Sequence, residues 1–342
     1  MDTDSGNRSL ERYASWLVVV VNRTNGATRV HVGSIMSIPS ISIIIVSFNT
    51  CNLLRNCLHS VERFLPESQV IVIDNASSDG SVAMVRSEFP DITLIESNTN
   101  LGFAGANNRG LLLATGEYLV LLNSDTLLED DTLTRCAQWM RIRKNLGAVT
   151  PLLIGVDNKP QTCQFRFMSL TNEIRQMLWQ DSYTLKGDDD SDCWLPGTAL
   201  VIRQEALRDI GGALDDNFFM YGEDADLSMR LCRAGWFRAV FRDGYIRHYG
   251  GASGGGADIQ RRSDLQAWYF HARYRWARKH WPFGAFVSLL CIDFLDIARG
   301  MITSLWNGNV LGRASYSKIK IASLIRAITG SPPPLPQRTE CL

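Results

Sequence analysis

Four short apolar segments, each separated from the next by a helical pattern, constrain the fold of this chain more than any other feature. The segments are rich in Ile, Val and Leu, which is typical of strands buried on both faces of a sheet. They cover residues 41–47, 69–74, 91–97 and 117–123, and helical patterns occupy 52–64, 80–89 and 105–115. This alternation predicts an α/β fold with a mostly parallel central sheet and helices on both faces.

All four predicted strands end in polar residues. The ends are Ser47–Asn49, Asp74–Asn75, Ser97–Asn98 and Asn123–Asp125. In open parallel sheets, ligands bind beyond the carboxyl ends of the strands. The sequence therefore predicts a binding site at this edge of the sheet.

Composition narrows the class of protein. The 342 residues include 35 Lys and Arg and 35 Asp and Glu, so the formal net charge is zero. A nucleic-acid-binding protein is usually more basic, and we expect no nucleic-acid partner. The eight Cys form no C-x-x-C pair, which disfavours a zinc or redox site and fits reduced thiols in a cytoplasm.

The pattern divides the chain into four parts. We expect residues 1–38 to be an extension outside the core, 39–258 a catalytic domain, 259–328 a helical extension and 329–342 a disordered tail. The regular alternation fades after 154. Beyond it we expect a strand at 194–203, a helix at 222–235, two short strands at 236–241 and 245–250, and loops at 186–192 and 251–258.

Two segments with polar residues near strand ends are candidates for ligand binding. Asp74 ends an apolar strand, where a carboxylate can accept the base N–H of a uracil or thymine; a turn residue is the alternative. The segment 98–110 ("NTNLGFAGANNRG") exposes Asn100 and Asn108. It lacks the G-x-G-x-x-G spacing after the first strand, which argues against a dinucleotide-binding oxidoreductase.

Three further places carry acid, base or metal chemistry. Asp125 follows Asn123 in an "NSD" strand end, where one carboxylate and diphosphate oxygens can hold a divalent cation. Glu223 and Asp224 open a predicted helix, where carboxylates either complement the helix dipole or act as a base. His248 is one of five His and ends a short strand beside glycines.

Seven segments in this order resemble the inverting glycosyltransferases of family 2, which have the GT-A fold, and most of all the bacterial rhamnosyltransferase branch. The segments are "IIIVSFN", "VIVIDNASSDGS", "NLGFAGANNRG", "YLVLLNSDT", "WLPGTALVIRQEAL", "FFMYGEDADLSMRL" and "IRHYGGAS", and they span roughly 41–253. Asn123 stands where many members have the first Asp of a D-x-D motif.

The resemblance implies roles for several candidate residues, and residue chemistry indicates roles for the others. Asp224 is implied to be the catalytic base, and Asp125 and His248 the ligands of Mg²⁺ or Mn²⁺. We expect Trp194 and Glu223 on the acceptor side. The residues expected to bind the donor nucleotide are Ser47, Asn49, Asp74, Asn100, Asn108 and Asn123.

The implied reaction moves a sugar from a nucleoside diphosphate to a hydroxyl of a cell-surface or lipid-linked glycan. The branch favours dTDP-L-rhamnose as donor. The alternatives are another donor, such as a UDP-hexose, and a non-catalytic protein that binds nucleotide sugars.

The segment 285–306 leaves its relation to membranes open. Its uncharged run is too short to span a bilayer, but acidic residues recur at helical spacing and leave a broad apolar face. It is either a helix packed on the catalytic domain or a helix lying in the plane of a membrane. We expect a cytoplasmic protein, and in the second case a peripheral one on the inner membrane.

Overall fold

The predicted alternation of strands and helices is present in the computed structural model. Its elements in the first half of the chain are β3 (Ile41–Ser47), α2 (Cys51–Phe64), β4 (Gln69–Asp74), α3 (Ser81–Glu88), β5 (Thr93–Glu96), α4 (Gly102–Leu111) and β6 (Tyr118–Asn123). The strands are apolar enough to be buried on both faces, and Ile43, Ile44 and Ile45 have no exposed surface. α2 turns Leu54, Cys57, Leu58 and Val61 to the same core, at the spacing of one helix face.

The structure describes residues 19–24, 27–32, 39–179, 193–250, 259–307, 310–329 and 332–333. Two units are distinguished, Met1–Pro39 and Ser40–Leu342. In the first, β1 (Val19–Thr24) and β2 (Ala27–Val32) form an antiparallel hairpin that we did not expect. The predicted loops at 186–192 and 251–258, and nearly all of the predicted tail, lie outside the described residues.

The second half of the chain adds strands on the other side of β6 and a set of helices. Its elements are β7 (Thr126–Leu127), α5 (Thr132–Ile142), β8 (Leu146–Ile154), β9 (Pro160–Gln161), β10 (Phe165–Arg166), α6 (Leu170–Trp179), β11 (Cys193–Trp194), β12 (Ala199–Arg203), α7 (Gln204–Asp209), α8 (Glu223–Arg233), β13 (Phe237–His248), α9 (Ile259–His280), α10 (Phe283–Asn307) and α11 (Val310–Thr329).

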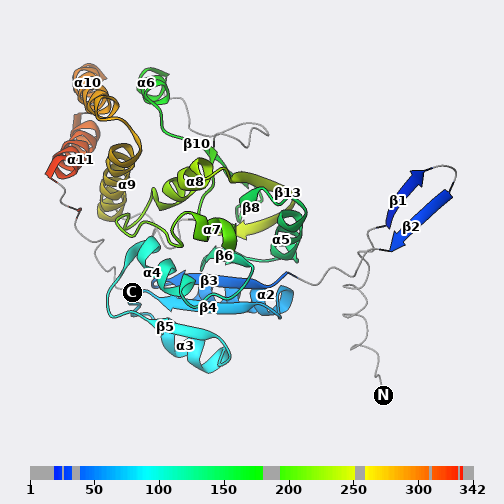
Figure 1. The fold of residues 1–342 in the computed structure, drawn as a ribbon. Coiled ribbons are helices and arrows are strands. Elements are labelled where there is room, and N and C mark those ends of the chain that lie inside the picture. Colours follow the sequence, from blue (N-terminus) through cyan, green and yellow to red (C-terminus); the bar gives the residue numbers. More distant parts are fainter. Residues whose placement is uncertain are drawn as a thin grey trace. The chain divides into compact units, whose positions relative to one another are not determined.

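Strands β3 to β9, β12 and β13 form one mixed nine-stranded sheet at the centre of Ser40–Leu342 (Figure 1), while β10 and β11 pair with each other in a separate antiparallel sheet. Its order is β5-β4-β3-β6-β12-β8-β13-β7, with β9 paired to β8. The four strands predicted from the first half are parallel neighbours. β12 runs antiparallel to both β6 and β8, and β13 returns parallel to β8.

Two predicted strand boundaries are wrong for identifiable reasons. The segment 194–203 is divided into β11 and β12, because Pro196 lacks the N–H that a ladder needs and Pro196–Gly197 turn the chain. The two short strands expected at 236–241 and 245–250 are one strand, β13, with a register shift between Phe241 and Tyr245. The irregular appearance of the sequence there reflects this bulge.

The helical extension packs on the catalytic part of the same unit. α10 contacts α6, α9 and α11 (Figure 1), around a cluster that includes Tyr274 and Leu289. A second apolar cluster joins α9 to the catalytic part through Phe167, Phe218, Ala272 and Trp276. Within the described residues, no helix combines the length and hydrophobicity needed to cross a bilayer.

Candidate active site

The carboxyl ends of the parallel strands meet at one edge of the sheet, as predicted. In the sheet register, Ser47 lies beside Asp74, and Val46 lies beside Asn123. Asp74 in turn lies beside Glu96, at the end of β5. The polar residues after these strands therefore form a continuous group.

In the part of the chain that the structure describes, Asp74 has one carboxylate oxygen that is left without a hydrogen-bond partner. Its side chain is buried, with 3% exposed surface. Oδ2 accepts a hydrogen bond from the Ser77 backbone N–H at 2.9 Å. Oδ1 is buried and has no hydrogen-bond partner among the described residues. A buried carboxylate oxygen without a donor is costly, and a base N–H would satisfy it.

The side chains of Ser47 and Asn49 hydrogen-bond within the loops that follow β3 and β4. The Ser47 side chain is fully buried and lies 3.0 Å from the Thr50 hydroxyl, which lies 2.9 Å from that of Ser124. Asn49 has a φ of 54°. Its Oδ1 accepts a hydrogen bond from Ser78 N–H at 2.8 Å, which ties the loop after β3 to the loop after β4. The expected contacts of both residues with the donor remain predictions.

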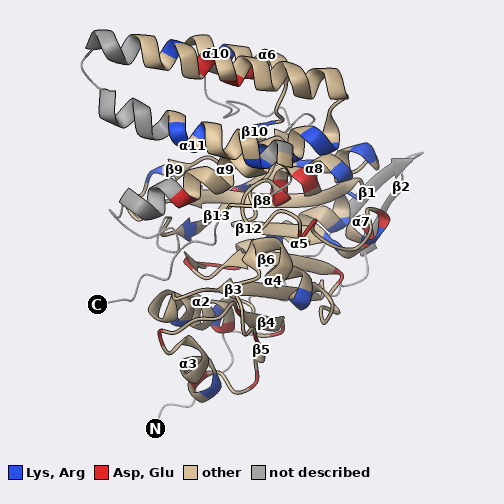
Figure 2. Ribbon diagram, turned by 90° about the vertical axis from the view of Figure 1, so that its left-hand side faces the viewer, with Lys and Arg blue, Asp and Glu red and all other residues tan. Residues whose placement is uncertain are grey.

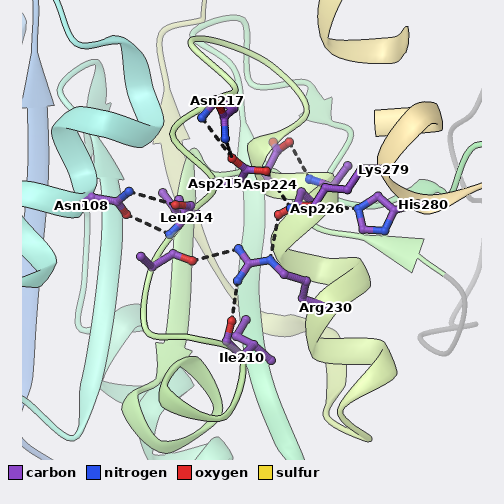
Figure 3. A network of polar contacts seen from close by, with 12 residues as sticks. Asn108, Ile210, Leu214, Asp215, Asn217, Asp224, Asp226, Arg230, Lys279 and His280 are labelled. Atoms are coloured by element: carbon purple, nitrogen blue, oxygen red, sulfur yellow. Dashed lines mark hydrogen bonds and ion pairs between the residues drawn. The ribbon is translucent and has the colours of Figure 1, made fainter. Parts of the chain in front are cut away.

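The two Asn of the 98–110 segment separate in the structure. Asn100 Oδ1 accepts hydrogen bonds from Asn75 and from Gly102 N–H, both at 2.9 Å, so this side chain shapes the loop after β5. Asn108 instead exchanges two hydrogen bonds of 2.9 Å with the backbone of Leu214 (Figure 3). Its amide thus joins α4 to the segment before α8, and its expected role in donor binding remains a prediction.

Gly102 explains why this glycine-rich loop is needed. A Cβ at Gly102 would lie 2.0 Å from the Phe219 carbonyl oxygen, and its φ is +71°. Phe103 N–H donates to the same carbonyl at 2.8 Å. The absence of a side chain therefore lets the loop contact the "FFMYGED" segment that leads into α8.

Asp125 and His248 lie side by side. His248 is opposite Thr126 in the antiparallel pairing of β13 with β7. This pairing places His248 Nε2 3.4 Å from Asp125 Oδ1. Asn123, at the end of β6 and two residues before Asp125, is partly exposed.

A residue that sequence reasoning missed contacts His248 from the other side. Gln161 on β9 lies with Oε1 2.7 Å from His248 Nδ1 and donates from Nε2 to the His248 carbonyl at 3.1 Å. A glutamine in an irregular segment carries no signal of this role, because only the pairing of β9 with β8 brings it to the strand ends.

The donor set of this pair fits a divalent cation. A carboxylate and an imidazole are both common metal ligands, and a cation bound with a diphosphate needs few protein ligands. Within the described part of the chain there is no group of three or more His, Cys, Asp or Glu placed to hold a metal. Asp125 and His248 would therefore share the ion with oxygens of a bound diphosphate.

Asp224 lies at the start of α8 and is held by backbone N–H groups. Its Oδ2 accepts a hydrogen bond from Gly197 N–H at 3.3 Å, and its Oδ1 from Ala225 N–H at 2.8 Å. Burial raises the pKa of Asp224 to about 6, although these hydrogen bonds oppose the rise. Such a carboxylate is ionised at neutral pH yet basic enough to take a proton.

Glu223 has a different environment from its neighbour. It is buried, and Oε2 has no hydrogen-bond partner among the described residues. Burial, followed by the charge of Asp224, raises the pKa of Glu223 well above its ordinary value. Of the two carboxyls, Asp224 is the one that lines a cavity.

That cavity has a volume of about 400 Å³, and five of its fourteen lining residues are aromatic. Trp194 lines it and stacks on Phe165, with ring centroids 4.4 Å apart and an interplanar angle of 16°. Its other aromatic lining residues are Tyr221, Tyr269 and Trp276. Flat aromatic faces beside a carboxylate suit the apolar face of a sugar ring.

The turn between β11 and β12 connects this cavity to the strand ends. Thr198 accepts a hydrogen bond from Asn123 N–H at 2.9 Å, while the preceding Gly197 donates to Asp224. The expected base is therefore joined through two consecutive residues to the end of β6.

Asp226 anchors α8 to the helical extension (Figure 3). It is fully buried, and Arg230 Nε, Lys279 Nζ and His280 Nε2 lie 2.8, 2.6 and 2.8 Å from its oxygens. Burial alone would raise the pKa of Asp226, but the hydrogen bonds from His280 and Lys279 and the charge of Arg230 outweigh it and lower the pKa to about 2. This acid of the "EDAD" segment is thus structural.

Comparisons with known proteins agree with this architecture. Residues 42–211 match the family described as glycosyl transferase family 2. An N-acetylglucosaminyl-diphospho-decaprenol L-rhamnosyltransferase of Mycobacterium tuberculosis is 25% identical over 207 residues, which cover 53% of this chain and 66% of the relative. A poly-beta-1,6-N-acetyl-D-glucosamine synthase of Staphylococcus epidermidis is 27% identical over 203 residues, covering 57% and 46%. The chain thus aligns with less than two thirds of the length of these relatives.

A solved structure supports the fold. A mannosyltransferase from Pyrobaculum calidifontis, in complex with GDP-Man and Mn²⁺, superposes with a TM-score of 0.53 at 16% identity, over 94% of this chain and 92% of that one. The expected GT-A fold, with a mixed central sheet flanked by helices and a helical C-terminal part, is confirmed. The order of its motifs and the match over residues 42–211 make this chain a member of glycosyl transferase family 2.

Proposed function

We propose that this protein is an inverting glycosyltransferase that moves L-rhamnose from dTDP-L-rhamnose to a hydroxyl of a lipid-linked or cell-surface glycan. The observation that carries the proposal is the position of Asp224, a carboxylate that lines a cavity with several aromatic side chains and whose pKa is raised by burial. Its environment is that of a general base in a sugar-binding site.

The reaction is a single displacement. Asp224 takes the proton of the acceptor hydroxyl, whose oxygen forms a bond to the anomeric carbon. The bond from that carbon to the diphosphate oxygen breaks, and the nucleoside diphosphate leaves with the electron pair. Hydrogen bonds from Gly197 and Ala225 hold the Asp224 carboxylate in place for the proton transfer.

The strand ends supply the donor site. The open Oδ1 of Asp74 suits the N3–H of thymine or uracil. Asp125 and His248 would hold a Mg²⁺ or Mn²⁺ ion, whose charge offsets that of the leaving diphosphate. Asn123 and Asn100 line the same edge and would contact the donor directly.

The choice of rhamnose rests on similarity to the rhamnosyltransferase relative, and other donors are the alternative. The synthase relative is named for an N-acetylglucosamine polymer, and the solved structure holds GDP-Man. Donor hydrolysis and thermal shift with dTDP-L-rhamnose, UDP-glucose, UDP-N-acetylglucosamine and GDP-mannose, with and without Mn²⁺, test the choice. Stabilisation and turnover by a UDP-hexose but not by dTDP-L-rhamnose would reject rhamnose and keep the transferase.

A lipid-linked acceptor accounts for the outer face of α10. Figure 2 shows α10 as mostly uncharged, with its charged residues gathered in one part. Phe294, Leu295 and Ile302 are 66%, 58% and 62% exposed, whereas Asp293 points inward to Arg273 and Lys320. We propose that this face lies in the surface of an anionic membrane, where a polyprenyl-linked acceptor would reside.

Flotation with anionic liposomes tests this contact. We expect the full-length protein to float at low salt, and the double variant Phe294→Asp, Leu295→Asp to remain at the bottom. Leu112→Asp is a matched control, because Leu112 is 85% exposed at the end of α4. If the wild-type protein does not float, the proposed membrane contact is rejected. The proposal that the protein is a transferase would still stand.

A further inference from the structure

Gln161 makes two hydrogen bonds to a single residue, His248. Its Nε2 donates to the His248 backbone carbonyl at 3.1 Å, and its Oε1 lies 2.7 Å from the His248 ring atom Nδ1. The side chain thus bridges β9 and the end of β13. The expected reaction gives no reason for these two hydrogen bonds.

The pair of contacts determines which ring nitrogen carries the proton. A carbonyl oxygen can only accept, so the amide nitrogen of Gln161 must be the atom beside the His248 carbonyl. This orientation leaves Oε1 beside Nδ1. Because an amide oxygen also only accepts, Nδ1 must carry a hydrogen, and in the neutral ring Nε2 then holds a lone pair.

The lone pair on Nε2 faces Asp125. His248 Nε2 lies 3.4 Å from Asp125 Oδ1. A neutral imidazole can bind a cation only through an unprotonated nitrogen, and the partner of the other nitrogen selects the tautomer. Gln161 selects the tautomer whose free nitrogen is the one beside the Asp125 carboxylate.

The position of Gln161 is itself supported. Gln161 pairs with Leu153 of β8, and the turn between the two strands closes with a hydrogen bond from Gly155 N–H to the Lys159 carbonyl at 2.9 Å. Arg247, the neighbour of His248, donates to the Gly155 carbonyl at 3.0 Å and to Asn158 Oδ1 at 2.9 Å. The same turn therefore contacts β13 at two consecutive residues.

We propose that Gln161 is a positioning residue that holds His248 in the Nδ1–H tautomer and thereby prepares it to bind a divalent cation together with Asp125. This inference rests on the proposed metal role of the pair. In this account Gln161 acts through His248: it sets the protonation of the His248 ring, and His248 binds the cation.

Two measurements on the wild type and two Gln161 variants, with two control variants, test the proposal. The tautomer of His248 is read from the ¹⁵N shifts of its ring in the metal-free protein at pH 8, with His248→Ala to assign the signal among the five His. Mn²⁺ affinity is measured by the electron paramagnetic resonance of free Mn²⁺ at saturating dTDP. The proteins are the wild type, Gln161→Leu, which removes both hydrogen bonds, and Gln161→Glu, which keeps an acceptor for Nδ1–H.

We expect the wild type to show the Nδ1–H tautomer and Gln161→Leu to lose it, with Mn²⁺ affinity falling by ~10- to 100-fold, the usual effect of removing the partner of a metal-bound His. Gln161→Glu should retain the tautomer and most of the affinity. Gln204→Leu is the matched control, because Gln204 follows β12 at the opposite end of β6, where Arg203 pairs with Tyr118.

Two results would overturn the proposal: a wild-type ring with its proton on Nε2, or a folded Gln161→Leu variant that keeps both the tautomer and the wild-type affinity. If Gln161→Leu does not fold, the proposal is tested by the tautomer of the wild type and by whether Gln161→Glu retains that tautomer and most of the Mn²⁺ affinity. Absence of Mn²⁺ binding by the wild type would contradict the metal role in the proposed function, and the metal-free tautomer would still decide for or against Gln161.

Discussion

Asp125 and His248 are far apart in the sequence, yet their side chains approach within 3.4 Å. The short pairing of β7 with β13 produces this contact, because it aligns His248 with the residue after Asp125. A carboxylate and an imidazole at the edge of the sheet where the parallel strands end form the proposed cation site.

Removing either residue should weaken metal-dependent nucleotide binding. We expect Asp125→Ala and His248→Ala each to reduce Mn²⁺-dependent affinity for dTDP by at least tenfold, since second-shell changes alone cost ~10- to 100-fold in metal affinity. Isothermal titration of dTDP with and without Mn²⁺ measures this. His59→Ala is the control, because His59 is an exposed residue of α2. If the wild type and the three variants bind dTDP with equal affinity in the presence of Mn²⁺, the proposed cation site is wrong.

Asp74 should determine affinity for the base. Replacing Asp74 with Ala removes an acceptor that carries charge, and such hydrogen bonds contribute ~1.5–3 kcal/mol, or roughly 10- to 100-fold in affinity. We expect dTDP binding to weaken by this factor and inorganic diphosphate binding to be unchanged. A loss that is equal for dTDP and diphosphate would mean that Asp74 supports the fold instead of reading the base.

The pH dependence of transfer should reflect the pKa of Asp224. That pKa is raised to about 6, so the carboxylate becomes protonated as the pH falls through 6 and can no longer accept a proton. We expect kcat/KM to level off above pH 7 and to be ~10-fold lower at pH 5. Donor binding measured over the same range is the control. A flat rate profile between pH 5 and 7 would argue against Asp224 as the base.

Asp226 should matter for stability rather than catalysis. Asp226→Asn leaves Arg230, Lys279 and His280 without their buried counter-charge, and breaking a buried ion pair costs ~3–5 kcal/mol. The lowered pKa, about 2 instead of 3.8, means that this stabilisation is complete above pH 4 and is lost as the pH falls from 4 to 2. Urea unfolding at pH 7 measures the loss in Asp226→Asn. Glu205→Gln, a change on the exposed face of α7, should have no such effect.

The sequence predicted those parts of the structure that depend on local patterns of apolar and polar residues. Buried apolar runs such as 41–47 predicted the parallel strands, and the register of those strands brought the residues at their ends together as expected. The hydrogen bonds of Ser47, Asn49 and Asn108 could not be predicted in this way. Their polar side chains are satisfied by Thr50, Ser78 and Leu214, and such pairings depend on loop conformation rather than on residue type.

Contacts between distant segments were also invisible in the sequence. Gln161 reaches His248 only because β9 pairs with β8, and Asp226 meets His280 only because α9 packs on α8. Neither pair has a periodic pattern that would reveal it. In the sequence, the acidic residues at the start of α8 fitted a helix dipole as well as a catalytic base. In the structure, Asp224 differs from Glu223 and Asp226 because it lines the cavity.

The central claim is that Asp224, and not Glu223, takes the proton. Asp224→Asn keeps the shape and the Gly197 contact position but removes the proton acceptor, and general-base catalysis is worth ~10²–10⁴-fold. The decisive measurement is the rate of sugar transfer at saturating donor by the wild type, Asp224→Asn and Glu223→Gln, with the dissociation constant of the donor measured in parallel. We predict that Asp224→Asn transfers ~10²- to 10⁴-fold more slowly with unchanged donor affinity, while Glu223→Gln changes mainly the KM for acceptor. Near wild-type transfer by Asp224→Asn would contradict the claim.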